Sequence, residues 1–311
     1  MQENLTGTAV NYPASLAGVA LLNVSAGTAG RSPDALAEVG AALQSAGLEC
    51  RVEAIESGQD PTGMARRAVE RGASLVIAGG GDGTISSIAA ALAGTDVALG
   101  VLPLGTLNHF ARDLKIPDDL EQAVQVIRQG HTRRIDAAEV NGRLFINNSS
   151  LGLYPHLVRQ RVQRQRSGWS KWTAFVWAAV AVFRRYPFLT VRIQPGDGTE
   201  LVRQTPLAFI GNNVYSTSAT NLGRRERLDE GTLCLYLAHH HGRLGLVRLA
   251  ISALLGRLDR DGALDCRRAC EIMIQTPRPA ALVACDGETH TLTSPLRYRI
   301  LPAALRVVVP E

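Results

Sequence analysis

A glycine-rich segment, Gly79–Thr84, has the residue types and spacing needed to hold phosphate. Four of its six residues are glycine, and without Cβ atoms the backbone N–H groups can approach a bulky anion. An apolar run, Ser74–Ala78, precedes the segment, and a small-residue helix pattern, Ile85–Ala93, follows it. The first turn of a helix attracts anions. We therefore interpret the segment as a nucleotide-phosphate loop; the alternative is a glycine-rich turn that only reverses the chain.

Asp82 is the acidic residue of this loop. Its carboxylate would repel a bare phosphate, and a divalent cation between the two groups would remove the conflict. Asp82 is therefore a candidate metal ligand.

The elements around the loop predict its position on a sheet. Expected strands alternate with helices that begin at Ser32-Pro33 and Asp60-Pro61 and end at glycines, a pattern typical of a parallel sheet with helices on both faces. The expected strands are Gly18–Leu22, Leu48–Ile55, Ser74–Ala78 and Val97–Leu102. Ligands of such sheets bind beyond the carboxyl ends of the strands. Three loops, Asn23–Gly27, Gly79–Thr84 and Leu104–Arg112, are expected to meet there.

The second half of the chain predicts an all-β domain. After an expected helix at Leu120–Gln129, Asn141-Gly142 indicates a hairpin turn. Further strands are expected at Phe188–Gln194, Leu201–Gly211, Thr232–Ala238, Ala269–Thr276, Ala281–Asp286 and Arg297–Pro302. Helical insertions are expected around Trp169–Arg185 and Leu244–Leu258, and the domain boundary near residues 130–132.

Composition indicates a globular protein, with 311 residues of which 46% are hydrophobic and 20% charged. Residues Met1–Ser15 have no secretory pattern, and no apolar run reaches the length of a membrane span. The five cysteines form no CxxC pair, so we expect reduced thiols and a cytoplasmic location. The net charge of +5 comes mainly from arginine. It suits phosphate or an anionic membrane, and it equally fits codon usage.

Four ordered motifs together resemble the diacylglycerol kinase catalytic domain, and most closely its bacterial lipid kinases. The family is related to sphingosine kinases and more remotely to NAD kinases. The motifs are Asn23–Gly27, Gly79–Thr84, Pro103–Arg112, and Asp286-Gly287-Glu288 with Pro295–Pro302. The resemblance covers nearly the whole chain.

This resemblance implies an ATP-binding α/β domain at 1–131, to which a C-terminal strand at about 303–311 returns. It also implies a β-sandwich lipid-substrate domain at 132–302, with the active site in the cleft between the domains. ATP and Mg²⁺ are the implied cofactors, and Asp286 is the implied general base. The implied nucleotide-binding residues are Asn23, Val24, Ser25, Ala26, Gly27, Ser57, Gly80, Gly81, Asp82, Gly83, Thr84, Ser87, Gly105, Thr106 and Asn108.

The role of Asp286 is chemically reasonable. An alcohol is a poor nucleophile, and a carboxylate at hydrogen-bond distance can take its proton as it attacks. Phosphoryl transfer otherwise needs positioning and neutralisation of charge. The alternative is that Asp286-Gly287 forms only a type I′ hairpin turn. Glu288 either orients the site or lies on the surface.

Several positions depart from the family pattern. His109 stands where an aspartate is usual, and Ser87 stands where a glutamate is common. A structural Mg²⁺ in many bacterial members is held by two aspartates three residues apart. Arg227 and Glu230 occupy those positions here, close to Thr232. We expect that metal to be absent or rearranged, and the nucleotide site to be retained.

The segment Trp169–Arg185 suggests contact with lipid. It contains all three tryptophans of the chain with arginines on either side, which suits an interfacial helix on an anionic membrane. The alternative is an amphipathic helix that packs on the sandwich. No nucleic-acid-binding motif accompanies the arginines. His239–His241 is expected to be an exposed strand end rather than a metal site.

The leading hypothesis is an ATP-dependent lipid kinase that phosphorylates a hydroxyl of a diacylglycerol-like or sphingoid lipid, associated peripherally with the membrane. One alternative is a kinase of a soluble acceptor, as in NAD kinases. Another is a catalytically silent, membrane-associated nucleotide-binding protein. The sequence leaves a homodimer open.

Overall fold

A computed structural model describes residues 18–23, 34–152, 155, 189–195, 200–216, 223–238 and 264–311. It divides into two compact units: unit 1 comprises Met1–Ala137 and Ala303–Glu311, and unit 2 comprises Ala138–Pro302. Four expected features lie outside the described residues: the loop Val24–Gly27, the insertions at 169–185 and 244–258, and His239–His241.

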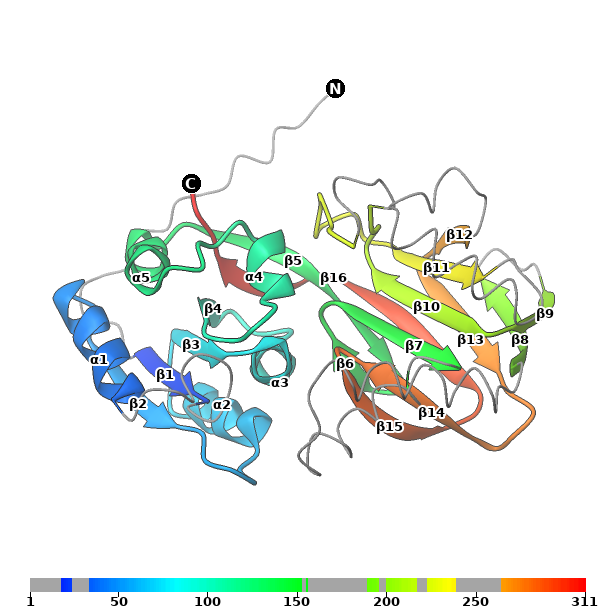
Figure 1. Ribbon diagram of the computed structural model, residues 1–311, viewed down its shortest axis with the longest axis horizontal. Coiled ribbons are helices and arrows are strands. Elements are labelled where there is room, and N and C mark those ends of the chain that lie inside the picture. The colour runs from blue at the N-terminus through cyan, green and yellow to red at the C-terminus, as the bar shows by residue number, and fades with distance from the viewer. Residues whose placement is uncertain are drawn as a thin grey trace. The chain divides into compact units, whose positions relative to one another are not determined.

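Unit 1 is an α/β structure built on a parallel sheet (Figure 1). Its strands follow the order β2-β1-β3-β4-β16. In chain order its elements are β1 (Gly18–Leu22), α1 (Ala35–Ser45), β2 (Cys50–Ala54), α2 (Pro61–Glu70), β3 (Leu75–Gly80), α3 (Asp82–Leu92), β4 (Ala98–Pro103), α4 (His109–Asp113) and α5 (Leu120–Gln129). The last strand, β16 (Leu296–Val308), pairs with β4 at Arg306 and Val307.

The strand order places helices on both faces of this sheet. The chain moves outward from β1 to β2 and then back across β1 to β3 and β4. Because parallel crossovers are right-handed, α1 covers one face and α2 and α3 cover the other. The packing agrees, since α2 lies against α3 and α1 against α5.

Local residue chemistry fixes the ends of these helices. The Asp60 carboxylate accepts the backbone N–H groups of Thr62 and Gly63, and Pro61 is the first residue of α2. Asp119 caps α5 in the same way, through Gln122 N–H. These are the helix starts and stops that the sequence predicts for α2 and α5.

The described part of unit 2 consists mainly of strands, which form two facing sheets. One sheet has the antiparallel order β12-β11-β10-β7-β14-β15; the other contains β9-β8-β13-β16 and the β5–β6 hairpin. The strands are β5 (Thr132–Val140), β6 (Arg143–Phe145), β7 (Asn148–Gly152), β8 (Leu189–Pro195), β9 (Leu201–Thr205), β10 (Leu207–Asn212), β11 (Leu233–Ala238), β12 (Leu264–Ala269), β13 (Glu271–Gln275), β14 (Ala280–Cys285) and β15 (Glu288–Thr293). The predicted fold class, a parallel α/β domain followed by an all-β domain, is confirmed.

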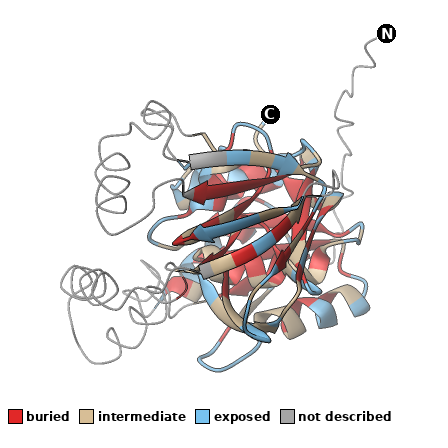
Figure 2. Cartoon of the chain, turned by 90° about the vertical axis from the view of Figure 1, so that its right-hand side faces the viewer, coloured by how far each residue is buried: buried red, intermediate tan, exposed pale blue. Residues whose placement is uncertain are grey.

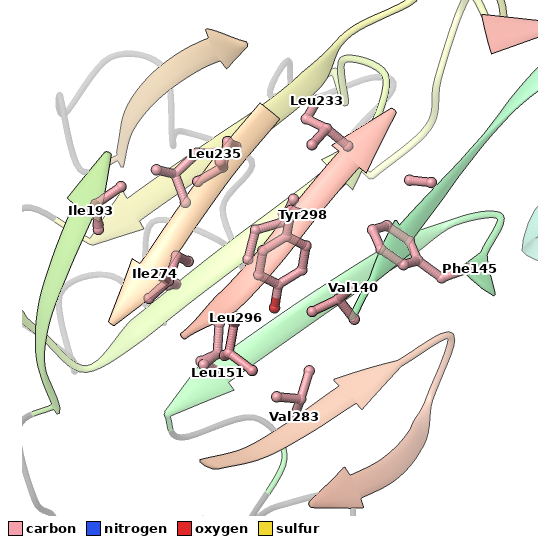
Figure 3. Packing of buried hydrophobic residues seen from close by; sticks show 14 of the residues in the cluster. Val140, Phe145, Leu151, Ile193, Leu233, Leu235, Ile274, Val283, Leu296 and Tyr298 are labelled. Carbon is pink, nitrogen blue, oxygen red and sulfur yellow. The ribbon is translucent and has the colours of Figure 1, made fainter. Parts of the chain in front are cut away.

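The core of unit 2 lies between its two sheets. Val140, Ile274 and Tyr298 come from one sheet and meet Leu151 and Val283 from the other (Figure 3). Buried and exposed residues alternate along the strands, because successive side chains point to opposite faces (Figure 2).

Some elements differ from the sequence-based expectation. Strands β12 and β15 and helix α4 are not predicted, and the expected strand Leu201–Gly211 is two strands that meet at Pro206. Proline has no N–H for a sheet ladder, so it interrupts the run. No helix among the described residues has the length and apolar character needed to cross a bilayer.

The expectation of five reduced cysteines is wrong for two of them. Cys234 in β11 and Cys266 in β12 form a disulfide, with Cα atoms 6.4 Å apart. In the register of these strands Tyr236 faces Cys266, so Cys234 and Cys266 are diagonal neighbours on one face of the sheet. Cys50, Cys270 and Cys285 are free thiols.

We predict that Phe145→Ala destabilises the protein by about 3–5 kcal/mol, because a fully buried ring leaves a cavity. The Phe145 ring packs edge-on against Tyr298, with centroids 6.3 Å apart. Urea unfolding measures the change. Val202→Ala is the control, since Val202 is 55% exposed and should change stability by no more than about 0.5 kcal/mol. A Phe145→Ala effect as small as that of the control would contradict this account of the core.

Candidate functional site

Three of the expected loops begin at one edge of the unit 1 sheet. In the parallel register Leu22 of β1 lies opposite Gly79 of β3, and Gly80 lies opposite Pro103 of β4. The segments that follow these strands therefore start side by side. The predicted convergence of the loops is confirmed for their described parts.

Asn23 connects the first loop to the second. Its backbone N–H donates to Gly79 O at 2.8 Å, and its Nδ2 donates to the Thr84 hydroxyl at 3.0 Å. Thr84 lies in the first turn of α3 and is mostly buried. The amide of Asn23 thus fixes the hydroxyl of Thr84 at the start of that helix.

The second and third loops touch through glycine backbones. A Cβ atom on Gly105 would lie 2.5 Å from Gly81 Cα and 2.7 Å from Asn108 Oδ1. A Cβ atom on Gly80 would lie 3.0 Å from Thr84 Cβ. Only glycine allows this approach at position 105, because backbone atoms cannot move aside as a flexible side chain can.

The glycine loop passes directly into α3. The helix begins at Asp82, earlier than the expected Ile85, with Gly81 as its N-cap residue. Glycine has no side chain that could cap this end, and the backbone N–H groups of a first helical turn have no partner within the helix. Such groups bind anions readily. The loop that the sequence predicts to hold phosphate therefore coincides with a helix N-terminus.

The Asp82 carboxylate has a structural role that the sequence does not predict. Its two oxygens accept the backbone N–H groups of His109 at 3.2 Å and Phe110 at 3.0 Å. It thus caps α4 from a residue 27 positions earlier in the chain and holds the third loop against the second. The His109 side chain itself is exposed.

Asn108 has a left-handed backbone (φ 49°) and is 4% exposed. Its Nδ2 donates to Pro103 O at 3.0 Å and lies 3.3 Å from Asp118 Oδ1. Its Oδ1 is buried and has no hydrogen-bond partner among the described residues. An unsatisfied buried acceptor costs about 1–3 kcal/mol. Asn108 holds the third loop in place through its Nδ2 group.

The remaining expected residues of this unit differ in position. Ser87 lies inside α3, where its hydroxyl donates to Gly83 O at 2.9 Å and its carbonyl accepts from the Thr62 hydroxyl. Thr106 is exposed in the third loop, and Ser57 is exposed in the turn after β2. The structure thus brings Asn23, Gly80, Gly81, Asp82, Gly83, Thr84, Gly105 and Asn108 together.

In unit 2, Asp286 and Gly287 form the two-residue turn between β14 and β15. Both have positive φ, 47° and 85°, and the flanking residues Cys285 and Glu288 are paired. This is the geometry of a type I′ hairpin. The prediction of a type I′ turn is therefore confirmed for the backbone. It does not account for the contacts of the Asp286 carboxylate.

Three consecutive backbone N–H groups hold that carboxylate. Ile146 N–H donates to Oδ2 at 2.8 Å, while Asn147 and Asn148 N–H donate to Oδ1 at 2.9 and 3.0 Å. In return, Asp286 N–H donates to Asn148 O at 2.9 Å. Hydrogen bonds to a carboxylate favour its charged form and fix its orientation. Asp286 is partly exposed, so an approaching group can reach it.

Neutral polar groups lie beside this turn. The Ser149 hydroxyl is 3.2 Å from the Tyr298 hydroxyl, and Cys285 Sγ lies 3.6 Å from Ser149 Oγ. Burial raises the pKa of the Cys285 thiol to about 12, and it also raises the pKa of the Tyr298 hydroxyl. Both groups therefore stay uncharged at neutral pH.

Charged groups lie on the strand that follows the turn and close to it. Partial burial raises the pKa of Glu288; Arg143 opposes this rise and Asp286 adds to it. Partial burial lowers the pKa of His290, and the positive charge of Arg143 lowers it further by a smaller amount. The Nε2 atom of His290 lies 3.8 Å from Glu288 Oε2. The Glu288 side chain is 57% exposed, so solvent screens these effects.

The segment with the departures at Arg227 and Glu230 has other contacts. Arg227 is exposed and forms an ion pair with Asp229 at 3.1 Å. Glu230 N–H donates to Asn213 Oδ1 at 3.1 Å, and the Thr232 hydroxyl lies 3.3 Å from Leu233 O. Within the described residues, no group of three or more His, Cys, Asp or Glu side chains is placed to hold a metal ion.

The described residues form an α/β unit with a glycine-rich loop beyond its parallel sheet, followed by a unit of two facing sheets. Family models match both parts of this architecture. Residues 18–140 match the diacylglycerol kinase catalytic domain, and residues 154–309 match the YegS C-terminal NAD kinase beta sandwich-like domain. The chain belongs to the diacylglycerol kinase family.

Individual relatives agree. A diacylglycerol kinase of Staphylococcus aureus is 39% identical over 207 residues, which are 66% of this chain and 64% of the relative. One of Staphylococcus epidermidis is 41% identical over 122 residues, 39% of this chain and 37% of the relative. The matches span 37% and 64% of these two relatives, so the chain covers less than two thirds of the length of each.

Solved structures share the fold. A diacylglycerol kinase of Bacillus anthracis has a TM-score of 0.69 at 20% identity, over 94% of this chain and 97% of the other. An NAD kinase of Archaeoglobus fulgidus in complex with ATP has a TM-score of 0.52 at 14% identity, over 94% and 93% of the two chains.

We predict that Gly105→Ala weakens nucleotide binding at least about tenfold, since a misplacement of about 1 Å has large effects in such sites and the new Cβ would push the two loops apart. Calorimetric titration with an ATP analogue measures this. The control is Gly40→Ala in α1, where a Cβ meets only Val52 Cγ2 at 4.0 Å. Equal affinity of both variants would contradict the loop contact.

Proposed function

We propose that this protein is an ATP-dependent lipid kinase, which transfers the γ-phosphate to a hydroxyl of a diacylglycerol-like or sphingoid lipid. The observation that carries the proposal is the Asp286 carboxylate, fixed by three backbone N–H groups in a partly exposed turn. Asp286 is the residue that the family resemblance implies as the general base. Membership of the diacylglycerol kinase family supports the reaction class.

The nucleotide phosphates are assigned to the glycine loop and the first turn of α3. Backbone N–H groups of Gly81–Thr84 supply hydrogen bonds without a desolvated countercharge. Asn108 supports this site from within the third loop, where its Nδ2 group donates to Pro103 O. Thr106 contributes its exposed hydroxyl, and Val24–Gly27 form the further expected contact.

Mg²⁺ fits this site as an ion carried by the nucleotide. Mg²⁺ is usually bound through one or two carboxylates together with substrate phosphates and water. Asp82 is the carboxylate of this loop, and each of its oxygens accepts one N–H group, which leaves lone pairs for a metal or its water. When bound, Mg²⁺ would neutralise charge on the phosphates.

In the proposed reaction, the acceptor hydroxyl oxygen attacks the γ-phosphorus. The new O–P bond forms as the bond from the γ-phosphorus to the bridging oxygen breaks, and ADP leaves with that electron pair. The hydroxyl proton passes to Asp286 late in the transfer. Oδ1 of Asp286 accepts two N–H groups and Oδ2 accepts one, so we assign the proton to Oδ2.

The names of the relatives, which are diacylglycerol kinases, support a lipid acceptor. The tryptophan- and arginine-rich segment 169–185 is the proposed contact with an anionic membrane. A soluble acceptor would instead indicate an NAD-kinase-like activity. ATP binding with no transfer would indicate a catalytically silent protein.

We predict that Asp286→Asn abolishes phosphorylation of the lipid and leaves the dissociation constant for ATP nearly unchanged, because the amide cannot take the proton. The measurements are a labelled-ATP transfer assay with purified diacylglycerol and sphingoid acceptors, and calorimetry for ATP. Asp229→Asn is the control, since Asp229 forms an exposed ion pair with Arg227. Retained transfer by the Asp286 variant would exclude it as the base.

A second prediction separates the two roles of Asp82. If its carboxylate also contacts the metal, Asp82→Asn should raise the Mg²⁺ concentration needed for half-maximal activity about tenfold or more, a loss of about 1.4 kcal/mol in metal binding. Asp60→Asn, at the cap of α2, is the control. If Asp82→Asn lowers thermal stability but leaves the Mg²⁺ titration unchanged, Asp82 acts only as a helix cap.

A further inference from the structure

Arg225 is a buried arginine that the sequence does not single out. It is 3% exposed. Its Nη1 donates to Ile146 O at 2.7 Å and to Asn212 O at 3.2 Å, and its Nη2 donates to Asn147 Oδ1 at 2.6 Å. The planar guanidinium can hold several acceptors in fixed directions, which an ammonium group cannot do. Two of these contacts fall on the segment that binds Asp286.

One peptide group connects Arg225 to Asp286. The carbonyl of Ile146 accepts from Arg225, and the N–H of the same peptide unit, that of Asn147, donates to Asp286 Oδ1 at 2.9 Å. A peptide unit is planar and rigid, so orienting its carbonyl also orients its N–H. Hydrogen bonds in such a chain polarise one another. The positive guanidinium therefore strengthens the N–H group that holds the negative carboxylate.

Neighbouring residues fix Arg225 in turn. Asn212 Nδ2 donates to the same Ile146 carbonyl at 2.8 Å. The guanidinium carbon lies 5.3 Å from the centre of the Tyr215 ring, within cation–π range. The Tyr236 hydroxyl accepts from Tyr215 N–H at 2.9 Å and lies 3.1 Å from Tyr215 O. A rigid aromatic and amide shell thus surrounds the guanidinium.

We propose that Arg225 is a positioning residue for Asp286: through the Ile146–Asn147 peptide group it sets the orientation of the carboxylate and stabilises its negative charge. The proposal rests on the proposed function, in which Asp286 takes the proton of the acceptor. In this proposal Arg225, a buried and fixed cation of unit 2, supports the general base Asp286 of the same unit. Arg227, two residues further on, is exposed and pairs with Asp229, so it lacks this role.

The test compares Arg225→Lys with the matched variant Arg227→Lys in the full chain. Arg225→Lys keeps the charge and loses the fork of donors. We expect kcat for lipid phosphorylation to fall about 10- to 100-fold, with KM for ATP unchanged within about twofold, because the carboxylate is misplaced by a fraction of an ångström. Arg227→Lys should retain the kinetic constants of the unmodified protein.

Amide hydrogen exchange provides a readout that does not depend on activity. In Arg225→Lys the amides of residues 146–148 should exchange faster, as they should in Asp286→Asn, while Arg227→Lys leaves them protected. Unchanged kcat, or unchanged exchange at residues 146–148, would overturn the proposal. If Arg225→Lys does not fold, Asn147→Ala removes only one acceptor and should move both readouts in the same direction by a smaller amount; no movement in either would again overturn it.

Failure of the Arg225 proposal can be distinguished from failure of the proposed kinase function. If the unmodified protein phosphorylates no lipid, the proposed function fails. The exchange measurement then still supports or overturns the coupling of Arg225 to Asp286.

Discussion

The binding of one carboxylate by three consecutive backbone N–H groups is the interaction on which the proposed chemistry depends. It requires a two-residue turn with two positive φ angles, which places Asp286 at the end of β14. It also requires the segment from Ile146 to Asn148, which leads into β7, to present its three N–H groups in one direction. The sandwich core packs against the strands on either side, and the buried Arg225 contacts Ile146 and Asn147. A hairpin turn and a catalytic carboxylate are thus compatible descriptions of the same residue.

A second constraint acts in unit 1, where the ends of parallel strands bring three loops to one edge. Gly81 and Gly105 touch without side chains, and Asp82 binds the loop that contains His109. Asp82 therefore has a structural role that does not depend on a bound metal. It joins the two loops mechanically, so replacing it should remove the cap of α4 even where no metal contact is lost.

Local sequence chemistry predicted much of the fold and less of the site. The caps of α2 and the strand before the glycine loop follow from residues that are close in sequence, and so does the Asn141-Gly142 turn. Asp82 caps α4 from 27 residues away, and Arg225 contacts Ile146 across 79 residues. No periodicity indicates such contacts. The Cys234–Cys266 disulfide, 32 residues apart, was missed because it depends on the register of β11 with β12, a strand that the sequence did not reveal.

The central claim is that the chain moves a phosphoryl group from ATP to a lipid hydroxyl. The most direct measurement incubates the purified full chain with a total lipid extract and γ-labelled ATP, and identifies the labelled products by mass spectrometry. The account predicts that the label appears in a lipid phosphate monoester. The lipid from which this product forms should be a diacylglycerol-like or sphingoid lipid with a free hydroxyl. Label confined to water-soluble products, or ATP binding without any labelled product, would contradict it.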